Sequence, residues 1–95
     1  MEARGKSISL NLVDYQINRV DDEYYVIELW VYNSGWSRAH VTEFIVPGYE
    51  SSIDVVLEPG VVEKIVLYVP TSKCVEPEKV VLVTDCGRSF LFELH

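Results

Sequence analysis

Few residues in this chain could carry out chemistry, and the first group is His40 with Ser37 and Asp54. A catalytic triad needs a serine on a strained, exposed turn, with a histidine and a carboxylate within hydrogen-bonding reach. The sequence contains no Gly-x-Ser-x-Gly turn of that kind. His95 is the only other histidine, so no two imidazoles stand at metal-ligand spacing. We therefore expect no enzymatic activity, no bound metal and no cofactor.

The two cysteines, Cys74 and Cys86, lack the Cys-x-x-Cys spacing of zinc sites and thioredoxin-like motifs. In a simple meander they lie near opposite poles, about 20 Å apart for a strand of ordinary length. A disulfide needs Cα atoms within roughly 7 Å of each other. We expect two free thiols; the alternative is a Cys74–Cys86 disulfide, which requires residues 71–78 to run back along the molecule. That bond would favour an extracellular or hyperthermophilic setting.

Three of the fifteen acidic residues are consecutive, Asp21-Asp22-Glu23. A calcium site needs several oxygens converging on one point, from ligands at spaced positions. Three consecutive carboxylates without an Asp-x-Asp pattern are typical of a solvated turn. Asp14 and Asp54 are too far apart in the sequence to be added to such a site.

Composition limits the partners that the chain can take. Its 95 residues, 48% of them hydrophobic, make one domain over residues 6–95, with residues 1–5 as a polar, disordered tail. Eight Lys+Arg against fifteen Asp+Glu give a net charge of −7, which disfavours nucleic acid and anionic membranes as partners. No apolar run approaches the roughly 18–20 residues that span a bilayer, so we expect no direct membrane insertion. The first residues also lack an apolar signal core.

The elements that must position these residues are all strands. Short β-rich segments alternate with turn signals about every ten residues, and no 3.6-residue periodicity of useful length occurs. The predicted strands span residues 6–17, 23–33, 38–46, 53–57, 61–69, 79–85 and 89–94. The apolar parity of the first segment switches between Leu12 and Val13, which predicts a bulge or a change of sheet. This pattern predicts an all-β, immunoglobulin-like, two-sheet antiparallel sandwich of about seven strands, with a small barrel as the alternative.

Two stretches carry a family resemblance: WVYNSGWSRAHVTEFIV at residues 30–46 and VVLEPGVVEKIVLYV at residues 55–69. A strand ending in Asn-x-Gly, a small residue at Ala39 and a Leu-x-Pro-Gly turn resemble the cell-adhesion-related (CARDB) domains of bacteria and archaea. The chain is also similar to the globular β-domains of archaeal pilin-like and flagellar accessory proteins, which often end in a hairpin like VVLVTDCGRSFLFEL. The resemblance implies an immunoglobulin-like sandwich without catalysis, outside the cell or at the cell envelope. A cytoplasmic location is the alternative.

Residues 23–33 have two distinct faces. Side chains alternate along a strand, so Ile27, Leu29 and the residues of the same parity point to one side. The other parity contains Glu28, and we therefore expect it to face outward. In the resembled fold residues 61–69 lie beside this strand, and the same reasoning turns Lys64 outward. The outward side chains then form an exposed face of Tyr24, Val26, Trp30, Tyr32, Val66 and Tyr68.

Exposed apolar patches mark interfaces, and Trp and Tyr are enriched in interface hot spots. We therefore expect a non-enzymatic structural or interaction module that binds a protein partner or a second copy of itself through this face. Val80–Val83 is apolar on both sides of its strand, so its outer side either meets a second chain or is solvated. Two alternatives remain: a carbohydrate- or small-ligand-binding module that uses the same rings, and a cytosolic accessory protein.

Overall fold

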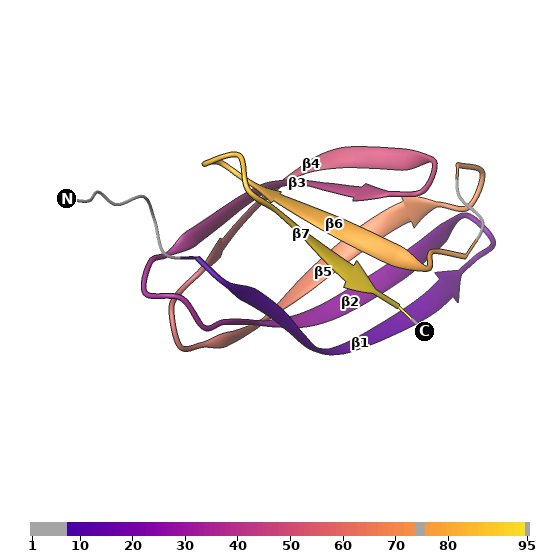
Figure 1. Ribbon diagram of the computed structural model, residues 1–95. Helices are drawn as coiled ribbons and strands as arrows, with labels where there is room; N and C mark the ends of the chain where they lie inside the picture. The colour runs from indigo at the N-terminus through magenta and orange to yellow at the C-terminus, as the bar shows by residue number, and fades with distance from the viewer. Residues whose placement is uncertain (1–7, 74–75, 95) are drawn as a thin grey trace.

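The computed structural model describes residues 8–73 and 76–94, and within them every regular element is a β-strand (Figure 1). The strands are β1 (Leu10–Val20), β2 (Tyr24–Asn33), β3 (Ala39–Val46), β4 (Tyr49–Leu57), β5 (Val62–Pro70), β6 (Lys79–Thr84) and β7 (Ser89–Glu93). The predicted tail, residues 1–5, lies outside the described residues. The described part of the chain forms no helix long and apolar enough to cross a bilayer.

The seven strands form two antiparallel sheets, one in the order β1-β2-β5 and one in the order β4-β3-β6-β7. The predicted two-sheet sandwich is therefore confirmed. In constant-type immunoglobulin domains the fourth strand shares a sheet with the first, second and fifth. Here β4 instead pairs with β3 through the tight turn at Pro47-Gly48, and this gives the division into three and four strands.

The core lies between the inner faces of the two sheets. Alternation along β2 buries Ile27, Leu29 and Val31 completely, and β5 adds Ile65, Leu67 and Val69. The four-stranded sheet contributes the facing layer, which includes Val41, Phe44, Leu57, Val80, Leu82 and Phe92. Complete burial of one leucine or isoleucine side chain contributes roughly 1.5–3 kcal/mol, so this double layer is the main source of stability.

The predicted parity switch in the first strand is a β-bulge. The register of β1 against β2 shifts between Leu12 and Asp14. Val13 is the extra residue and is exposed, whereas Tyr15 and Ile17 on the far side of the bulge still pack against the core. A bulge allows both halves of β1 to keep their apolar side chains inward.

Three predicted boundaries differ from the structure by more than one residue. β4 begins at Tyr49 rather than at residue 53, because the two-residue turn brings Ser51 and Ser52 into register with β3 despite their low strand propensity. β1 begins at Leu10 and runs on to Val20, so the turn that follows is shorter than predicted. In that turn Asp21 and Asp22 have φ angles of 52° and 57°, a left-handed conformation that aspartate tolerates.

Candidate interaction surface

The orientation predicted for β2 and β5 is the one the structure shows. Ile27 and Leu29 are fully buried, while Trp30 and Tyr32, which have the other parity of the strand, point to the outside of the three-stranded sheet. The six predicted side chains therefore share one outer surface, which we call the aromatic face: Tyr24, Val26, Trp30 and Tyr32 from β2, and Val66 and Tyr68 from β5. No other sheet of the described chain covers it, because β1, β2 and β5 form one outer layer of the sandwich.

One half of the aromatic face is centred on two tyrosines. Val26 lies opposite Tyr68 in the register, and the Tyr24 and Tyr68 rings meet edge to face with centroids 6.5 Å apart. Tyr68 is 59% exposed. Edge-to-face rings hold each other in place, so this half offers an apolar surface whose side chains are already ordered.

A charged pair interrupts the middle of the face, and the sequence analysis did not foresee it. Lys64 Nζ lies 3.5 Å from Glu28 Oε2 and 5.9 Å from the centroid of the Trp30 ring. Lys64 and Trp30 are opposite each other in the register, so the cation lies above the indole. The Trp30 side chain is half-buried, and the face consists of two apolar halves separated by an ion pair.

The second half of the face is wider than predicted. Tyr32 lies opposite Val62, which is 47% exposed, and the bulge residue Val13 is exposed on the neighbouring strand beside Trp30. Neither valine was predicted to belong to the face. Both nevertheless follow from alternation: Val62 shares the outward parity of Lys64, and Val13 comes directly after Leu12, whose side chain packs against the core.

The most exposed large hydrophobic side chain among the described residues was not predicted. Trp36 is 88% exposed, in the loop between β2 and β3. Asn33 fixes that loop: it is completely buried and its Nδ2 donates to Ser37 O at 2.9 Å and to Leu57 O at 3.0 Å. Its Oδ1 accepts from the Gly35 amide at 2.9 Å. The loop is thus held on both sides of Trp36.

The same loop lies at the tryptophan end of the aromatic face. The Gly60 amide donates to Asn33 O at 2.8 Å, which joins the β2–β3 loop to the turn that leads into Val62. Trp36 and Tyr32 are therefore at one end of the molecule. The signal available in the sequence was the Asn-x-Gly turn itself, since an Asx turn followed by a tryptophan places a large ring on a constrained loop.

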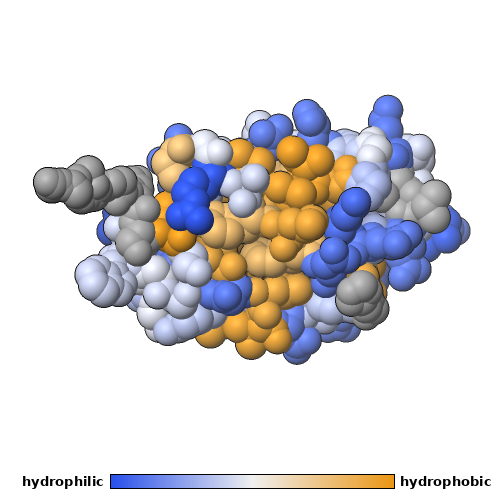
Figure 2. Space-filling model, in the orientation of Figure 1, coloured by the Kyte–Doolittle hydropathy of each residue, from blue (hydrophilic) through white to orange (hydrophobic). Residues whose placement is uncertain are grey.

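The outer side of the four-stranded sheet is a second apolar surface. Val80 and Leu82 enter the core as predicted for one side of β6, and Val81 and Val83 on the other side are half-buried. Register places Ile45, Val81 and Leu91 in one row across β3, β6 and β7. Figure 2 shows an apolar area across the middle of the side on which β6 and β7 lie in front.

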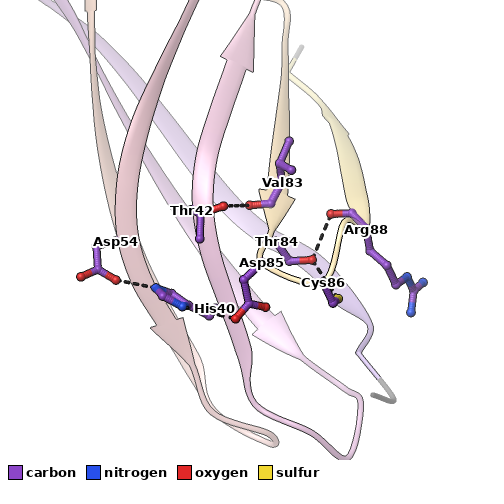
Figure 3. Close-up of polar contacts among 8 residues, drawn as sticks. All are labelled: His40, Thr42, Asp54, Val83, Thr84, Asp85, Cys86 and Arg88. Carbon is purple, nitrogen blue, oxygen red and sulfur yellow. Dashed lines mark hydrogen bonds and ion pairs between the residues drawn. The ribbon is translucent and has the colours of Figure 1, made fainter. Parts of the chain in front are cut away.

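His40 forms a polar cluster at one end of the four-stranded sheet (Figure 3). Its Nε2 lies 2.6 Å from Asp54 Oδ1 on β4, and its Nδ1 lies 3.5 Å from Asp85 Oδ2 in the β6–β7 turn. The Asp85 amide also donates to His40 O at 2.9 Å. Both ring nitrogens face carboxylates, so the imidazole links three segments of the sheet. Ser37 was the serine considered as a partner of His40. Its backbone carbonyl instead accepts a hydrogen bond from Asn33 Nδ2 in the β2–β3 loop.

Cys86 lies in the turn next to this cluster. It is exposed with a free thiol, and its Sγ lies 3.2 Å from Thr84 Oγ1. The hydrogen bond from the buried Thr84 lowers the pKa of the Cys86 thiol, and a second bond from the Arg88 backbone acts in the same direction. Cys74 lies outside the described residues, so two free thiols stay the prediction and a Cys74–Cys86 disulfide stays the alternative.

The acidic turn between β1 and β2 is exposed to solvent. Asp21 and Asp22 are exposed, and Asp22 Oδ1 lies 3.5 Å from Arg19 Nε. Within residues 8–73 and 76–94, no group of three or more His, Cys, Asp or Glu side chains is placed to hold a metal ion.

Comparison with known proteins adds no identity to this geometry. No protein-family model matches the chain, and no curated protein matches it significantly. The functional proposal therefore rests on the surfaces described above.

Proposed function

We propose that this protein is a non-enzymatic structural or interaction module that binds another protein chain, or a second copy of itself, through the aromatic face. One observation carries the proposal: the outer side of the three-stranded sheet carries the exposed rings of Tyr24 and Tyr68 and the half-buried rings of Trp30 and Tyr32, with Trp36 88% exposed at its end. Proteins rarely leave such side chains exposed together unless they meet a partner.

The order of these side chains supports recognition. The Tyr24 and Tyr68 rings fix each other, and the hydrogen bonds of Asn33 fix the loop of Trp36. Ordered anchors lose little conformational entropy on binding, which raises affinity for a given contact area. The charged pair between Lys64 and Glu28 in the middle of the face selects partners that can complement or tolerate it.

A protein partner fits this face better than a sugar. Stacking on a sugar ring needs an open aromatic face, and one side of Trp30 carries the Lys64 ammonium. The valines Val13, Val62 and Val66 around the rings are apolar and exposed, and they offer no hydrogen bonds to hydroxyl groups. An extracellular or cell-envelope setting is part of the proposal and rests on the resemblance to cell-adhesion-related domains.

The test compares two variants of the chain in solution. Trp30→Ala with Tyr32→Ala removes the anchors of the aromatic face, and Leu91→Ala removes an exposed apolar side chain from the opposite sheet as the matched control. We expect the double variant, and not the control, to change the sedimentation-velocity mass distribution or to lose the partner recovered with the wild-type chain. Unchanged mass and unchanged partner recovery for the double variant would rule the proposal out.

A further inference from the structure

The three-stranded sheet ends at β5, which pairs with β2 on one side and with no strand of the described chain on the other (Figure 1). The Thr71 amide donates to Glu23 O at 2.9 Å, in the register that continues from β5 and β2. Backbone groups point to alternate sides along a strand, so the odd-numbered residues of β5 direct their N–H and C=O groups to β2. The even-numbered residues direct theirs to the open side, and these are Val62, Lys64, Val66 and Tyr68.

The residues that direct backbone groups to this open edge also carry the outer side chains of the strand. All four side chains are exposed, while Ile65 and Leu67 between them are buried. A sheet edge with donors, acceptors and exposed apolar side chains is a template for a further strand. The edge of β5 therefore extends the aromatic face to a place where another chain can pair with the sheet.

Lys64 limits the antiparallel registers in which two copies of β5 can pair. Pairing about Lys64 sets two ammonium groups opposite each other, and pairing about Ile65 sets them on the diagonal, where long like-charged side chains still repel. Pairing about Val66 sets Lys64 of each copy opposite Tyr68 of the other, with the two lysines roughly 14 Å apart along the strands. Pairing further along brings in Pro70, which has no N–H to donate. Charge and hydrogen bonding therefore favour the register about Val66.

We propose that β5 pairs antiparallel with β5 of a second copy about Val66, which joins two three-stranded sheets into one continuous sheet. The inference rests on the proposed function and names its partner as a second copy of this chain. In this register the row that begins with Trp30 and Lys64 of one copy continues with Tyr68 of the other. The Lys64 ammonium then lies between an indole and a phenol ring, and both kinds of ring attract a cation. The tryptophan half of each aromatic face thus meets the tyrosine half of the other.

Two features make this pairing weak and reversible. Each copy carries a net charge of −7, so two copies repel each other until salt screens the charges. Glu63 has the inner parity of β5, and an inward charge at a sheet edge limits strand pairing. The register about Val66 forms no ion pair between the copies, so added salt should strengthen the association. Association that weakens with salt would contradict this register.

Cysteine cross-linking tests the register. The two Val66 residues form a hydrogen-bonded pair at the two-fold axis, with Cα atoms about 5.5 Å apart, within the range of a disulfide. In a background of Cys74→Ser with Cys86→Ser, Val66→Cys should therefore oxidise to a covalent dimer on a non-reducing gel. Val62→Cys is the matched control, an exposed position of the same edge whose counterpart lies roughly 27 Å along the strands. No covalent dimer from Val66→Cys, or an equal yield from Val62→Cys, would overturn the proposal.

Sedimentation velocity over a concentration series tests the same edge without cysteine. Val66→Lys places two like charges opposite each other and should weaken the dimer about tenfold or more. Val56→Lys, at an exposed valine of β4 in the other sheet, is the matched control and should leave the dimer unchanged. A wild-type chain that stays monomeric at every concentration, or equal effects of the two lysine variants, would overturn the proposal.

The same measurement separates this inference from the proposed function. We expect Trp30→Ala with Tyr32→Ala to weaken the dimer as well, because the rows of the aromatic face cross the paired edge. Association that is lost with Val66→Lys but kept with the double alanine variant would uphold the edge and contradict recognition through the aromatic face. Association that is lost with the double alanine variant but kept with Val66→Lys would uphold the aromatic face and overturn the edge.

Discussion

Lys64 Nζ lies 5.9 Å from the centroid of the Trp30 ring, directly across the register between β5 and β2. The same ammonium lies 3.5 Å from Glu28 Oε2. One cation thus satisfies a carboxylate and covers an indole on a surface that would otherwise be apolar. The Lys64–Glu28 ion pair makes the middle of the aromatic face polar and leaves the two apolar halves beside it available for contact.

The interaction of Lys64 with Trp30 should be measurable in a double-mutant cycle. A cation over an indole at a partly exposed site contributes about 0.5–1 kcal/mol. The ion pair with Glu28 adds a similar or smaller amount, because Lys64 is about half exposed and Glu28 is partly exposed. We expect Lys64→Met and Trp30→Leu to couple by about 0.5 kcal/mol in urea unfolding. A coupling energy of zero would mean that the two side chains do not interact in solution.

The rotation of β2 predicts two very different alanine variants. Leu29→Ala removes a fully buried side chain and should lower the free energy of unfolding by about 2–5 kcal/mol. Tyr32→Ala removes a half-buried ring from the outer face and should cost about 1 kcal/mol. Chemical denaturation of both variants measures the difference. Equal losses, or a larger loss for Tyr32→Ala, would be inconsistent with the outward direction of the aromatic face.

Asn33 should be the most sensitive polar residue of the chain. Asn33→Ala leaves the buried Leu57 carbonyl without its side-chain donor and frees the loop of Trp36. Each unsatisfied buried group costs about 1–3 kcal/mol, so we expect a loss of about 2–4 kcal/mol in unfolding free energy. The control Asn18→Ala, at an exposed position of β1, should stay within about 0.5 kcal/mol of wild type. Faster amide exchange around Trp36 in the Asn33→Ala variant would confirm the role of the loop.

Alkylation of Cys86 should show its lowered pKa. The Thr84 hydroxyl and the Arg88 backbone stabilise the thiolate of the folded chain, so the pKa lies below the ordinary value of 9.0. In a Cys74→Ser background, the reaction with iodoacetamide should reach half its maximal rate at a lower pH in the folded chain than in urea. The stability that this thiolate adds is present above the unfolded pKa and disappears as the pH falls through the folded pKa.

Thr84→Val supplies the control for that experiment, because it keeps the shape of the side chain and removes the hydroxyl. The pH profile should then move upward toward that of the unfolded chain. A profile that is the same for Thr84→Val, the parent and the unfolded chain would contradict the assigned cause.

Alternation in the sequence was enough to predict the orientation of β2 and β5 and the bulge of β1. In β2 the position of Glu28 decided which side faces outward, and at Leu12 and Val13 the change of parity could be read directly. These features follow from the two-residue repeat of a strand, which is local. The start of β4 was missed because it depends on pairing with β3, which overrides the low propensity of Ser51 and Ser52.

The parts of the site that were not predicted depend on contacts between distant segments. Trp36 is held outward by the bonds of Asn33 to Leu57, a residue 24 positions later. His40 meets Asp54 because the β3–β4 register puts them on neighbouring strands, although the pair was noted in the sequence only as part of an improbable triad.

Site-specific photo-cross-linking tests the role of the aromatic face most directly. One chain carries p-benzoylphenylalanine in place of Tyr68, which is 59% exposed on that face, and another carries it in place of Leu91, which is 55% exposed on the opposite sheet. Both are irradiated in extracts of the source cells and as purified protein. We predict a discrete adduct from position 68, either with one protein or with a second copy, that is lost when Trp30→Ala and Tyr32→Ala are added. No adduct from position 68, or the same adduct from position 91, would contradict recognition through this face.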